Sequence, residues 1–322
     1  MRNEMIEFGD CRNTMRKWAA EGVRVQTCVT SPPYFGLRDY GHDGQIGLEQ
    51  KPDEYVAKLV EVFRCVRDVL ADDGTVWLNM GDSYARQVGK VSEQSRHWDG
   101  RDRDPGAMHA TRHVDNMPGY KPKDLIGIPW MLAFALRADG WYLRQDIIWH
   151  KPNPMPESVR DRCTKAHEYI FLLSKSERYF FDSDPIREPI KPTNTGYIQA
   201  RARTASGALG GQNKNNFETR AYSEIKGANR RSVWTVNTKS YKGAHFATFP
   251  PDLIEPCILA GSRAGDTVLD PFMGSGTTAA VAIKHGRKYR GCELNPEYKP
   301  LQDERIKNAE AEVSQKNLFK HA

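Results

Sequence analysis

The sequence has 322 residues, 39% of them hydrophobic and 27% charged, which is typical of a soluble globular protein with one large core and an accessory domain. No apolar run reaches the roughly 18 residues that a transmembrane helix needs, so we expect no membrane association. The first residues carry no signal-peptide pattern, which predicts a cytoplasmic location.

The six cysteines are scattered along the chain and form no CxxC pair. This spacing excludes a disulfide framework and a cysteine-based zinc site, and it predicts reduced thiols. His109 and His113 have a ligand-like spacing but lie in a polar loop without further ligands, so we expect no metal site.

The formal net charge of +6 is concentrated in one part of the chain. Residues 187–242 contain 11 Lys and Arg against 3 Asp and Glu, a net charge of +8, while the remainder holds 36 basic and 38 acidic residues. Because this stretch is also rich in glycine and asparagine, it favours a polyanion-binding insert over an ordinary solvated face.

Hydrophobic periodicity predicts strands that alternate with helices, and therefore a parallel, doubly wound α/β sheet. The long polar segment 83–121 is predicted to be a mobile loop. We expect helices at 13–21, 53–70, 123–137, 251–260, through 279–283 and after 295–297. We expect strands at 6–11, 23–29, 75–80, 141–150, 167–173, 178–181, 267–270 and 288–293.

One stretch combines a strand, an acid and a glycine turn: residues 267–278, Thr-Val-Leu-Asp-Pro-Phe-Met-Gly-Ser-Gly-Thr-Thr. Glycines at 274 and 276 let the backbone approach a ligand closely. Glu293 ends the next strand 19 residues after Gly274, the spacing at which a βαβ unit presents a carboxylate to ribose hydroxyls.

The turn is not a GxGxxG, and Asp270 would repel a pyrophosphate, which disfavours a nicotinamide dehydrogenase. Asp270 suits a cationic group such as the ammonium of an amino acid. A ligand that joins adenosine to an amino acid is S-adenosylmethionine, which we therefore expect as the cofactor.

A second motif, Ser31-Pro32-Pro33-Tyr34, follows the strand predicted at 23–29. Two consecutive prolines fix φ and remove two donors, so the strand must end there in a stiff, extended loop. The loop presents the Ser31 oxygen and the Pro32 carbonyl as fixed acceptors, with the Tyr34 ring beside them.

Together the two motifs resemble those of DNA amino-methyltransferases, and their order, with the basic insert between them, resembles the β-class of that family. Residues 9–11, 167–169, 245–250 and 291–295 also fall where that class has motifs, so the resemblance spans nearly the whole chain. It implies a circularly permuted Rossmann-like methyltransferase sheet with a small basic target-recognition insert.

The resemblance also implies three regions: a catalytic half at 1–182, a target-recognition insert at 183–242 and a cofactor-binding half at 243–322. It implies that Glu293 holds the ribose, Asp10 faces the adenine ring, and Phe249 contacts the methionine end. The full set of expected cofactor-binding residues is Asp10, Cys11, His245, Phe249, Asp270, Pro271, Phe272, Gly274, Gly276, Thr277, Glu293 and Asn295.

The chemistry requires these residue types because the exocyclic amine of a base is a poor nucleophile. Acceptors at Ser31 and Pro32 could bond both amino hydrogens and free the nitrogen lone pair, with no covalent intermediate. The base must leave the duplex, and Tyr34 could stack on it. The expected catalytic residues are Ser31, Pro32, Pro33 and Tyr34, and the expected contacts to double-stranded DNA are Arg201, Arg203, Arg230, Arg231 and Trp234.

Several alternatives stay open at this stage. Cytosine N4 is preferred over adenine N6 because Ser31 stands where many adenine enzymes of the family carry Asp. A methyltransferase of RNA or protein glutamine is a second reading, and a non-catalytic DNA-binding protein on the same fold is a third. A cognate restriction endonuclease is a candidate partner.

Overall fold

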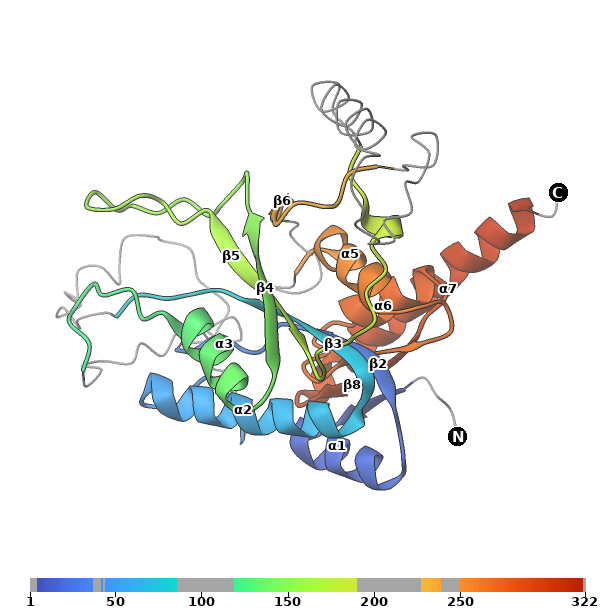
Figure 1. The fold of residues 1–322 in the computed structure, drawn as a ribbon, viewed down its shortest axis with the longest axis horizontal. Coiled ribbons are helices and arrows are strands. Elements are labelled where there is room, and N and C mark those ends of the chain that lie inside the picture. The colour runs from blue at the N-terminus through green and yellow to red at the C-terminus, as the bar shows by residue number, and fades with distance from the viewer. Residues whose placement is uncertain are drawn as a thin grey trace, which may run out of the picture.

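The computed structural model describes residues 5–36, 42, 44–85, 119–189, 227–238 and 249–320. These residues form one eight-stranded sheet with helices on both faces (Figure 1). The strands are β1 (Met5–Phe8), β2 (Val25–Thr30), β3 (Leu70–Met80), β4 (Tyr142–His150), β5 (His167–Ser174), β6 (Val233–Thr235), β7 (Thr267–Asp270) and β8 (Lys288–Glu293).

Six α-helices and two short 3₁₀ turns connect the strands in the described part of the chain. Helix α2 shows why they form: Pro52 opens it, Asp53 and Glu54 occupy its first turn, and Arg67 lies in its last turn, which suits the helix dipole. The α-helices are α1 (Cys11–Ala20), α2 (Pro52–Val69), α3 (Ile128–Ala138), α5 (Pro251–Gly261), α6 (Thr277–Lys284) and α7 (Lys299–Lys320), and the 3₁₀ turns are η3 (Asp184–Ile186) and η5 (Pro296–Tyr298).

The sheet order is β1-β8-β7-β2-β3-β5-β4-β6. Strands β1, β8, β7, β2 and β3 are parallel to one another, and β5 alone runs antiparallel to its neighbours β3 and β4. The predicted doubly wound sheet is confirmed as mostly parallel. Strand β1, near the start of the chain, pairs in parallel with β8, near its end. The loops that follow these two strands therefore leave the sheet side by side.

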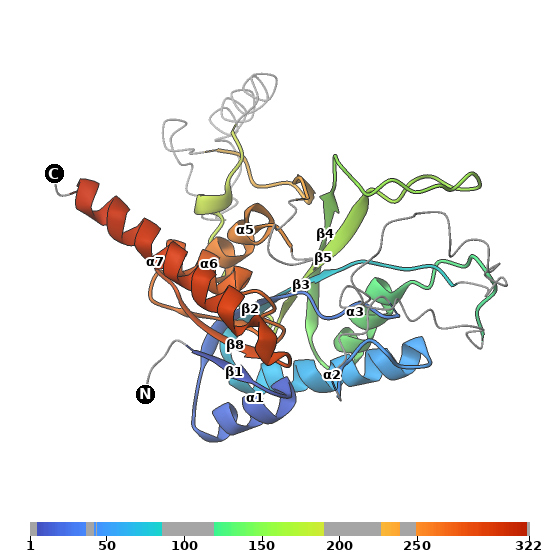
Figure 2. The same cartoon turned by 180° about the vertical axis from the view of Figure 1, so that it is seen from behind.

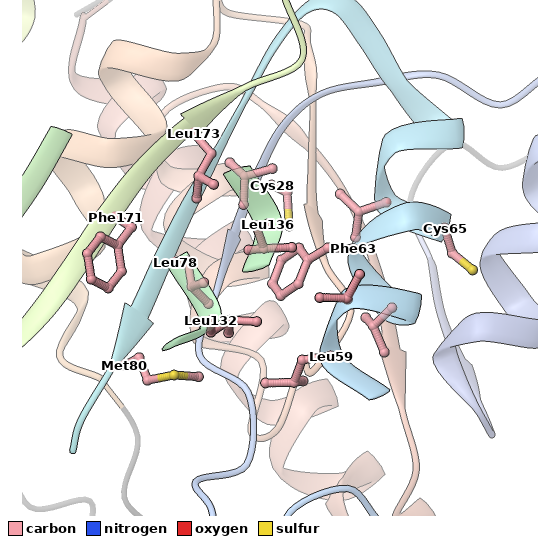
Figure 3. Packing of buried hydrophobic residues seen from close by; sticks show 14 of the residues in the cluster. Cys28, Leu59, Phe63, Cys65, Leu78, Met80, Leu132, Leu136, Phe171 and Leu173 are labelled. Carbon is pink, nitrogen blue, oxygen red and sulfur yellow. The ribbon is translucent and has the colours of Figure 1, made fainter. Parts of the chain in front are cut away.

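Two apolar clusters fill the space between the sheet and its helices. Helices α1, α2 and α3 cover one face, and α5 and α6 cover the other, as the opposite views in Figures 1 and 2 show. Figure 3 shows Leu59 and Phe63 of α2 meeting Leu78 of β3 and Leu132 of α3 in the first cluster. No described helix is both long and apolar enough to cross a membrane.

Four predicted elements differ from the structure. The strand predicted at 6–11 ends at Phe8, because Asp10 caps helix α1, which begins at Cys11. Residues 178–181 do not form a strand, because β5 is already paired along both edges and offers no free edge to a hairpin partner. Helix α3 starts at Ile128, later than predicted, since Gly127 has a φ of 85° and Pro129 favours a first turn. Strand β3 starts at Leu70, directly after α2, through an irregular pairing with β2.

Truncating Leu78 tests whether the first cluster carries stability. This side chain is fully buried in β3, so Leu78→Ala should lower the free energy of unfolding by about 2–5 kcal/mol in urea denaturation. Leu125→Ala is the matched control, because that side chain is 52% exposed and should cost less than about 0.5 kcal/mol. Equal losses for both variants would contradict the assignment of Leu78 to the core.

Candidate active site

The carboxyl edge of the sheet is hollowed by a cavity of about 320 Å³, a size typical of small-molecule sites. The segments that follow β1, β2, β7 and β8 form much of its wall. Of the residues predicted from sequence, the cavity is lined by Asp10, Cys11, Ser31, Pro32, Pro33, Tyr34, Phe249, Pro271, Phe272, Gly274, Glu293 and Asn295.

Sheet pairing explains why these distant segments meet. Strand β7 lies beside β2 in parallel register, so the loops after Asp270 and after Thr30 leave the sheet side by side. Strand β1 lies beside β8 in the same way, and the Gly9 amide donates to the Glu293 carbonyl oxygen over 2.8 Å. Both predicted motifs therefore contribute to one cavity.

The glycine turn is built as the sequence suggested, with left-handed backbone at Gly274 (φ 52°) and Gly276 (φ 84°). The Gly274 amide donates to the Glu293 carboxylate over 2.7 Å, and the Gln302 side chain donates to the Gly274 carbonyl, also over 2.7 Å. Gly276 and the following Thr277 do not line the cavity. Their place is the start of α6, where the Thr277 hydroxyl contacts Arg305.

Glu293 joins two loops at the cavity wall. One carboxylate oxygen accepts from Gly274 and the other accepts from the Asn295 amide over 2.8 Å. Burial raises the pKa of Glu293, and the backbone donors oppose that rise. Because a carboxylate has about four acceptor positions, this arrangement leaves acceptor capacity for a ligand hydroxyl.

Asp10 lies at the same wall, next to the end of β1. Its side chain caps α1 by accepting from the Arg12 amide over 2.8 Å, and it forms an ion pair with the Arg12 guanidinium at 2.7 Å. The hydrogen bonds from Arg12 hold the pKa of Asp10 below its ordinary value, although partial burial works against them. Asp10 therefore presents a charged, oriented carboxylate.

The structure corrects the role predicted for Asp270. Its carboxylate does not line the cavity; it is buried and accepts from Thr30 (2.6 Å), Thr278 (2.7 Å) and the Phe272 amide (3.0 Å). Desolvation raises its pKa from 3.8 to about 6, and these hydrogen bonds limit the rise. Asp270 thus shapes the two loops from beneath and is not placed as a direct partner of a ligand ammonium.

The Ser-Pro-Pro-Tyr loop is clamped from below by α2. The Tyr55 hydroxyl donates to the Pro33 carbonyl over 2.8 Å, and the ring of Phe35 packs on Tyr55 with 5.5 Å between ring centroids. Gly47 approaches from the other side, where a Cβ atom would lie 3.1 Å from the Tyr34 carbonyl oxygen. These contacts support the stiffness that the paired prolines predict.

A buried polar cluster surrounds the Tyr34 side chain. Its hydroxyl donates to Glu168 over 2.7 Å and lies 3.4 Å from the Asn79 side-chain oxygen. The Asn79 amide donates to the same Glu168 oxygen over 3.2 Å, and Lys151 forms an ion pair with the other oxygen. Burial raises the pKa of Tyr34 well above its ordinary value, and the negative charge of Glu168 adds to the rise.

The sequence interpretation missed most of this cluster. Asn79, Lys151 and Glu168 all line the cavity, as does Trp149, whose ring lies 4.3 Å from the Lys151 ammonium. Residues 167–169 fall where the β-class has a motif, but the sequence alone assigns them no role. Their positions in the sequence could have indicated them. Asn79 and Lys151 lie at the carboxyl ends of β3 and β4, and Glu168 lies at the start of β5, which is antiparallel and so begins at the same side of the sheet.

The residues predicted to contact DNA have different environments. Arg231 is exposed and pairs with Glu188 at 2.7 Å, whereas the Arg230 guanidinium lies 4.5 Å from the Trp234 ring centroid. Trp234 is only 4% exposed and belongs to β6 and the second apolar cluster, so its ring supports Arg230 from below and is closed to direct contact with DNA. Arg201, Arg203 and His245 lie outside the described residues.

The cavity lining fits S-adenosylmethionine. The Ser275 hydroxyl, in the glycine turn, is buried at the cavity wall without a hydrogen-bond partner in the described structure. Buried polar atoms are nearly always paired, so this orphaned hydroxyl indicates a polar ligand group nearby. Acids at Asp10 and Glu293 and an apolar ring at Phe272 complete a lining suited to an adenosine that carries an amino acid.

Comparison with known proteins identifies close relatives. The N6/N4 methyltransferase family, described as DNA methylase, matches residues 25–304. The chain is 45% identical to Type II methyltransferase M.Cfr9I of Citrobacter freundii over 95% of this chain and 88% of the relative. It is 46% identical to Type II methyltransferase M.SmaI of Serratia marcescens over 95% of this chain and 91% of the relative.

Solved structures share the fold at lower identity. The PvuII DNA methyltransferase, titled cytosine-N4-specific, aligns with a TM-score of 0.58 and 19% identity, covering 94% of this chain and 85% of that one. A protein of Thermus thermophilus, titled a putative DNA modification methylase in complex with S-adenosyl-L-methionine, aligns with a TM-score of 0.55 and 23% identity, covering 95% and 94%.

The raised pKa of Asp270 predicts a measurable pH effect on stability. The folded protein binds this proton more tightly than the unfolded chain, so the stabilisation is full below pH 3.8 and is lost as the pH rises through about 6. The difference between 3.8 and about 6 corresponds to roughly 3 kcal/mol. Asp270→Asn should abolish this decrease in the free energy of unfolding, because asparagine does not titrate. Urea unfolding of both proteins at about pH 4, 5, 6 and 7 would measure the difference.

The matched control is Asp146→Asn, because that side chain is exposed on β4 and lies at no helix end. It should leave the pH profile of the wild type unaltered. If Asp270→Asn and the wild type have the same profile, the Asp270 carboxyl is not desolvated in solution.

Proposed function

This chain belongs to the N6/N4 family of DNA methylases, and we propose that it methylates the N4 atom of a cytosine that has left the DNA duplex. At the coarser level it is a site-specific Type II DNA amino-methyltransferase that uses S-adenosylmethionine. The observation that carries the proposal is that Ser31 and Pro32 line the same cavity as Phe272, Gly274 and Glu293.

The two ends of this cavity have different chemistry. The loops after β1, β7 and β8 supply the acids and the glycine turn that suit the cofactor, which provides an activated methyl group when bound. The loop after β2 supplies Ser31, Pro32 and Tyr34, with Glu168 behind them. A base that enters beside Ser31 would therefore place its amino group next to the cofactor loop.

Ser31 and Pro32 would act on the amino group by accepting its two hydrogens. Hydrogen bonds from both hydrogens draw the nitrogen toward tetrahedral geometry and free its lone pair for attack. The paired prolines and the bond from Tyr55 to Pro33 hold these acceptors still, so orientation supplies much of the acceleration. Tyr34 stacked on the base would return about 1–3 kcal/mol of the few kcal/mol that extrusion costs.

Two observations support cytosine over adenine. Ser31 is a neutral acceptor at the first position of the loop. Lys151 also lines the cavity, and its ammonium has three donors, of which the ion pair with Glu168 occupies one. Cytosine offers O2 as an acceptor beside N3, whereas adenine has a C–H group in the corresponding place, so a lysine donor favours cytosine. The PvuII enzyme, whose title is cytosine-N4-specific, shares the fold.

The basic insert at 183–242 would read the recognition sequence. Within its described part, half-buried Arg230 and exposed Arg231 precede Trp234, and the ring of Trp234 would hold the Arg230 guanidinium toward DNA. Arginine can bond guanine edges in pairs or clamp phosphates. Arg201 and Arg203 belong to the same basic insert and would add positive charge for DNA binding.

The remaining alternatives have less support. Adenine N6 is the second candidate product, because adenine presents an amino group beside a ring nitrogen in the same arrangement. RNA and protein glutamine fit poorly with a family described as DNA methylase. Since the relatives carry the name Type II methyltransferase, we propose a restriction endonuclease of the same specificity as a partner and the cytoplasm as the location.

The methylated nucleoside identifies the target base directly. DNA treated with the enzyme and S-adenosylmethionine, then digested and analysed by mass spectrometry, should contain N4-methylcytosine. Ser31→Ala should lower the rate about tenfold, because one hydrogen bond to the amino group is lost. N6-methyladenine as sole product would refute the cytosine assignment, and C5-methylcytosine would refute the mechanism, because that reaction needs a nucleophile this loop lacks.

Replacing Glu168 tests whether the polar cluster orients Tyr34. Glu168→Gln keeps the shape but exchanges a charged acceptor for a neutral one, so kcat should fall about 10- to 100-fold while affinity for S-adenosylmethionine in calorimetry stays unchanged. Tyr34→Phe removes the same hydrogen bond from the other side. If Glu168 acts through Tyr34, the double variant should be no slower than the slower single variant, and additive losses would contradict that coupling.

A further inference from the structure

Residues 151–166, here called the arm, connect β4 to β5 and carry the most exposed large apolar side chain described in the protein. Figures 1 and 2 show the arm as a long yellow-green loop that projects away from the sheet and from both layers of helices. Met155 is 86% exposed, between Pro154 and Pro156. A single exposed methionine needs no explanation by itself, so the inference depends on how the arm is built.

The arm is held in one conformation by specific contacts. Glu157 accepts from the Arg162 guanidinium over 2.7 Å and from the Lys165 amide over 3.1 Å. The Arg162 guanidinium also lies 4.0 Å from the Tyr84 ring centroid. Near the start of the arm, the Asn153 side chain accepts from the Thr238 amide over 2.9 Å and donates to its carbonyl over 3.1 Å.

Prolines at 152, 154 and 156 restrict the backbone further. A rigid support matters because a side chain presented in this way loses little conformational entropy when it binds. Met155 is therefore an exposed apolar side chain on a loop with a restricted backbone.

Both ends of the arm are attached to the wall of the cavity. Lys151 and Glu168, which line the cavity, form an ion pair where the arm begins and ends, and the Lys151 amide donates to the Ala166 carbonyl over 2.8 Å. The Lys165 ammonium donates to the Asp82 carbonyl after β3 over 2.5 Å. The arm therefore starts and ends beside the opening through which a base would enter the cavity.

The charges of the arm suit a nucleic acid. Its two acids are neutralised locally, Glu157 by Arg162 and Asp161 by Lys123. Arg160 is exposed and, within the described part of the chain, has no ion-pair partner. The arm thus presents an apolar tip with an exposed cation, the combination that architectural proteins use when they insert a side chain between base steps beside phosphates.

We propose that Met155 is a wedge that enters the base stack of the DNA and fills the place left by the flipped base. Methionine suits this role because its unbranched, polarizable side chain adapts to an irregular gap. Filling the gap would stabilise the open duplex while the base is held beside Ser31 and Tyr34. The inference rests on the proposed function in one respect, namely that the base leaves the duplex.

The experiment uses the whole enzyme, its methylated site once mapped, and duplexes that carry a base analogue at the target position. Pyrrolocytosine serves for a cytosine target and 2-aminopurine for an adenine target, since both fluoresce more when unstacked. Met155→Ala should reduce the fluorescence increase on binding and lower kcat about tenfold on a fully paired duplex. Met155→Leu should retain both, because it restores the apolar volume.

Tyr142→Ala is the matched control, because Tyr142 is 44% exposed at the start of β4. The arm begins at the other end of that strand. It should leave fluorescence and kcat unchanged. A duplex with a mismatch at the target pair should restore most of the kcat of Met155→Ala, since an unpaired base costs less to extrude. A defect in the fold or in DNA affinity alone would not be restored in this way.

The outcomes separate the wedge from the proposed function. Wild-type fluorescence that rises and is unaffected by Met155→Ala overturns the wedge alone. An equal loss of kcat on paired and mismatched duplexes also overturns it. Methylation by the wild type without any fluorescence increase overturns base flipping itself, and the wedge with it. The choice between cytosine and adenine is decided by the nucleoside product and is independent of this experiment.

Discussion

The buried carboxylate of Asp270 ties together the two loops on which the active site depends. It accepts from Thr30, the residue before Ser31, and from the Phe272 amide of the cofactor loop, while Thr278 bonds it from α6. A carboxyl group without an ionic partner is costly to bury, and its pKa of about 6 reflects that cost. Any shift of β7 against β2 would break these bonds, so the distance between the glycine turn and the Ser-Pro-Pro-Tyr loop is set beneath the cavity.

The sheet turns this local tie into a complete site. Parallel strands bring their carboxyl ends to one edge, so loops from near the start of the chain and from near its end meet beside the Ser-Pro-Pro-Tyr loop. Strand β5 is antiparallel and contributes its start, which places Glu168 at the same edge. Under the proposed function, the methyl donor and the amine that receives the methyl group would be held on one rigid framework, as positioning catalysis requires.

Glu168 links the Ser-Pro-Pro-Tyr loop to the arm that, under our proposal, would meet the DNA. One oxygen of its carboxylate accepts a hydrogen bond from the Tyr34 hydroxyl, and the other forms an ion pair with Lys151, the first residue of the arm. Burial of this cluster at the cavity wall makes the loss of any one partner costly, because the others would be left unpaired. The ring that would stack on the base and the arm beside the duplex therefore share one electrostatic support.

The sequence alone determined the α/β fold, the family resemblance and the two loops that line much of the cavity, because strand ends, proline pairs and glycine turns are local features. Local spacing indicated Gly274 and Glu293, the family resemblance added Asp10, and all three line the cavity. Only the tertiary structure determined strand direction, burial and hydrogen-bond partners, because these depend on residues that are distant in the chain. It made β5 antiparallel and left 178–181 without an edge to pair with. It turned Asp270 inward and buried Trp234 beneath Arg230. It also gathered Asn79, Lys151 and Glu168 around Tyr34, because burial and hydrogen-bond partners arise only when separate strands come together.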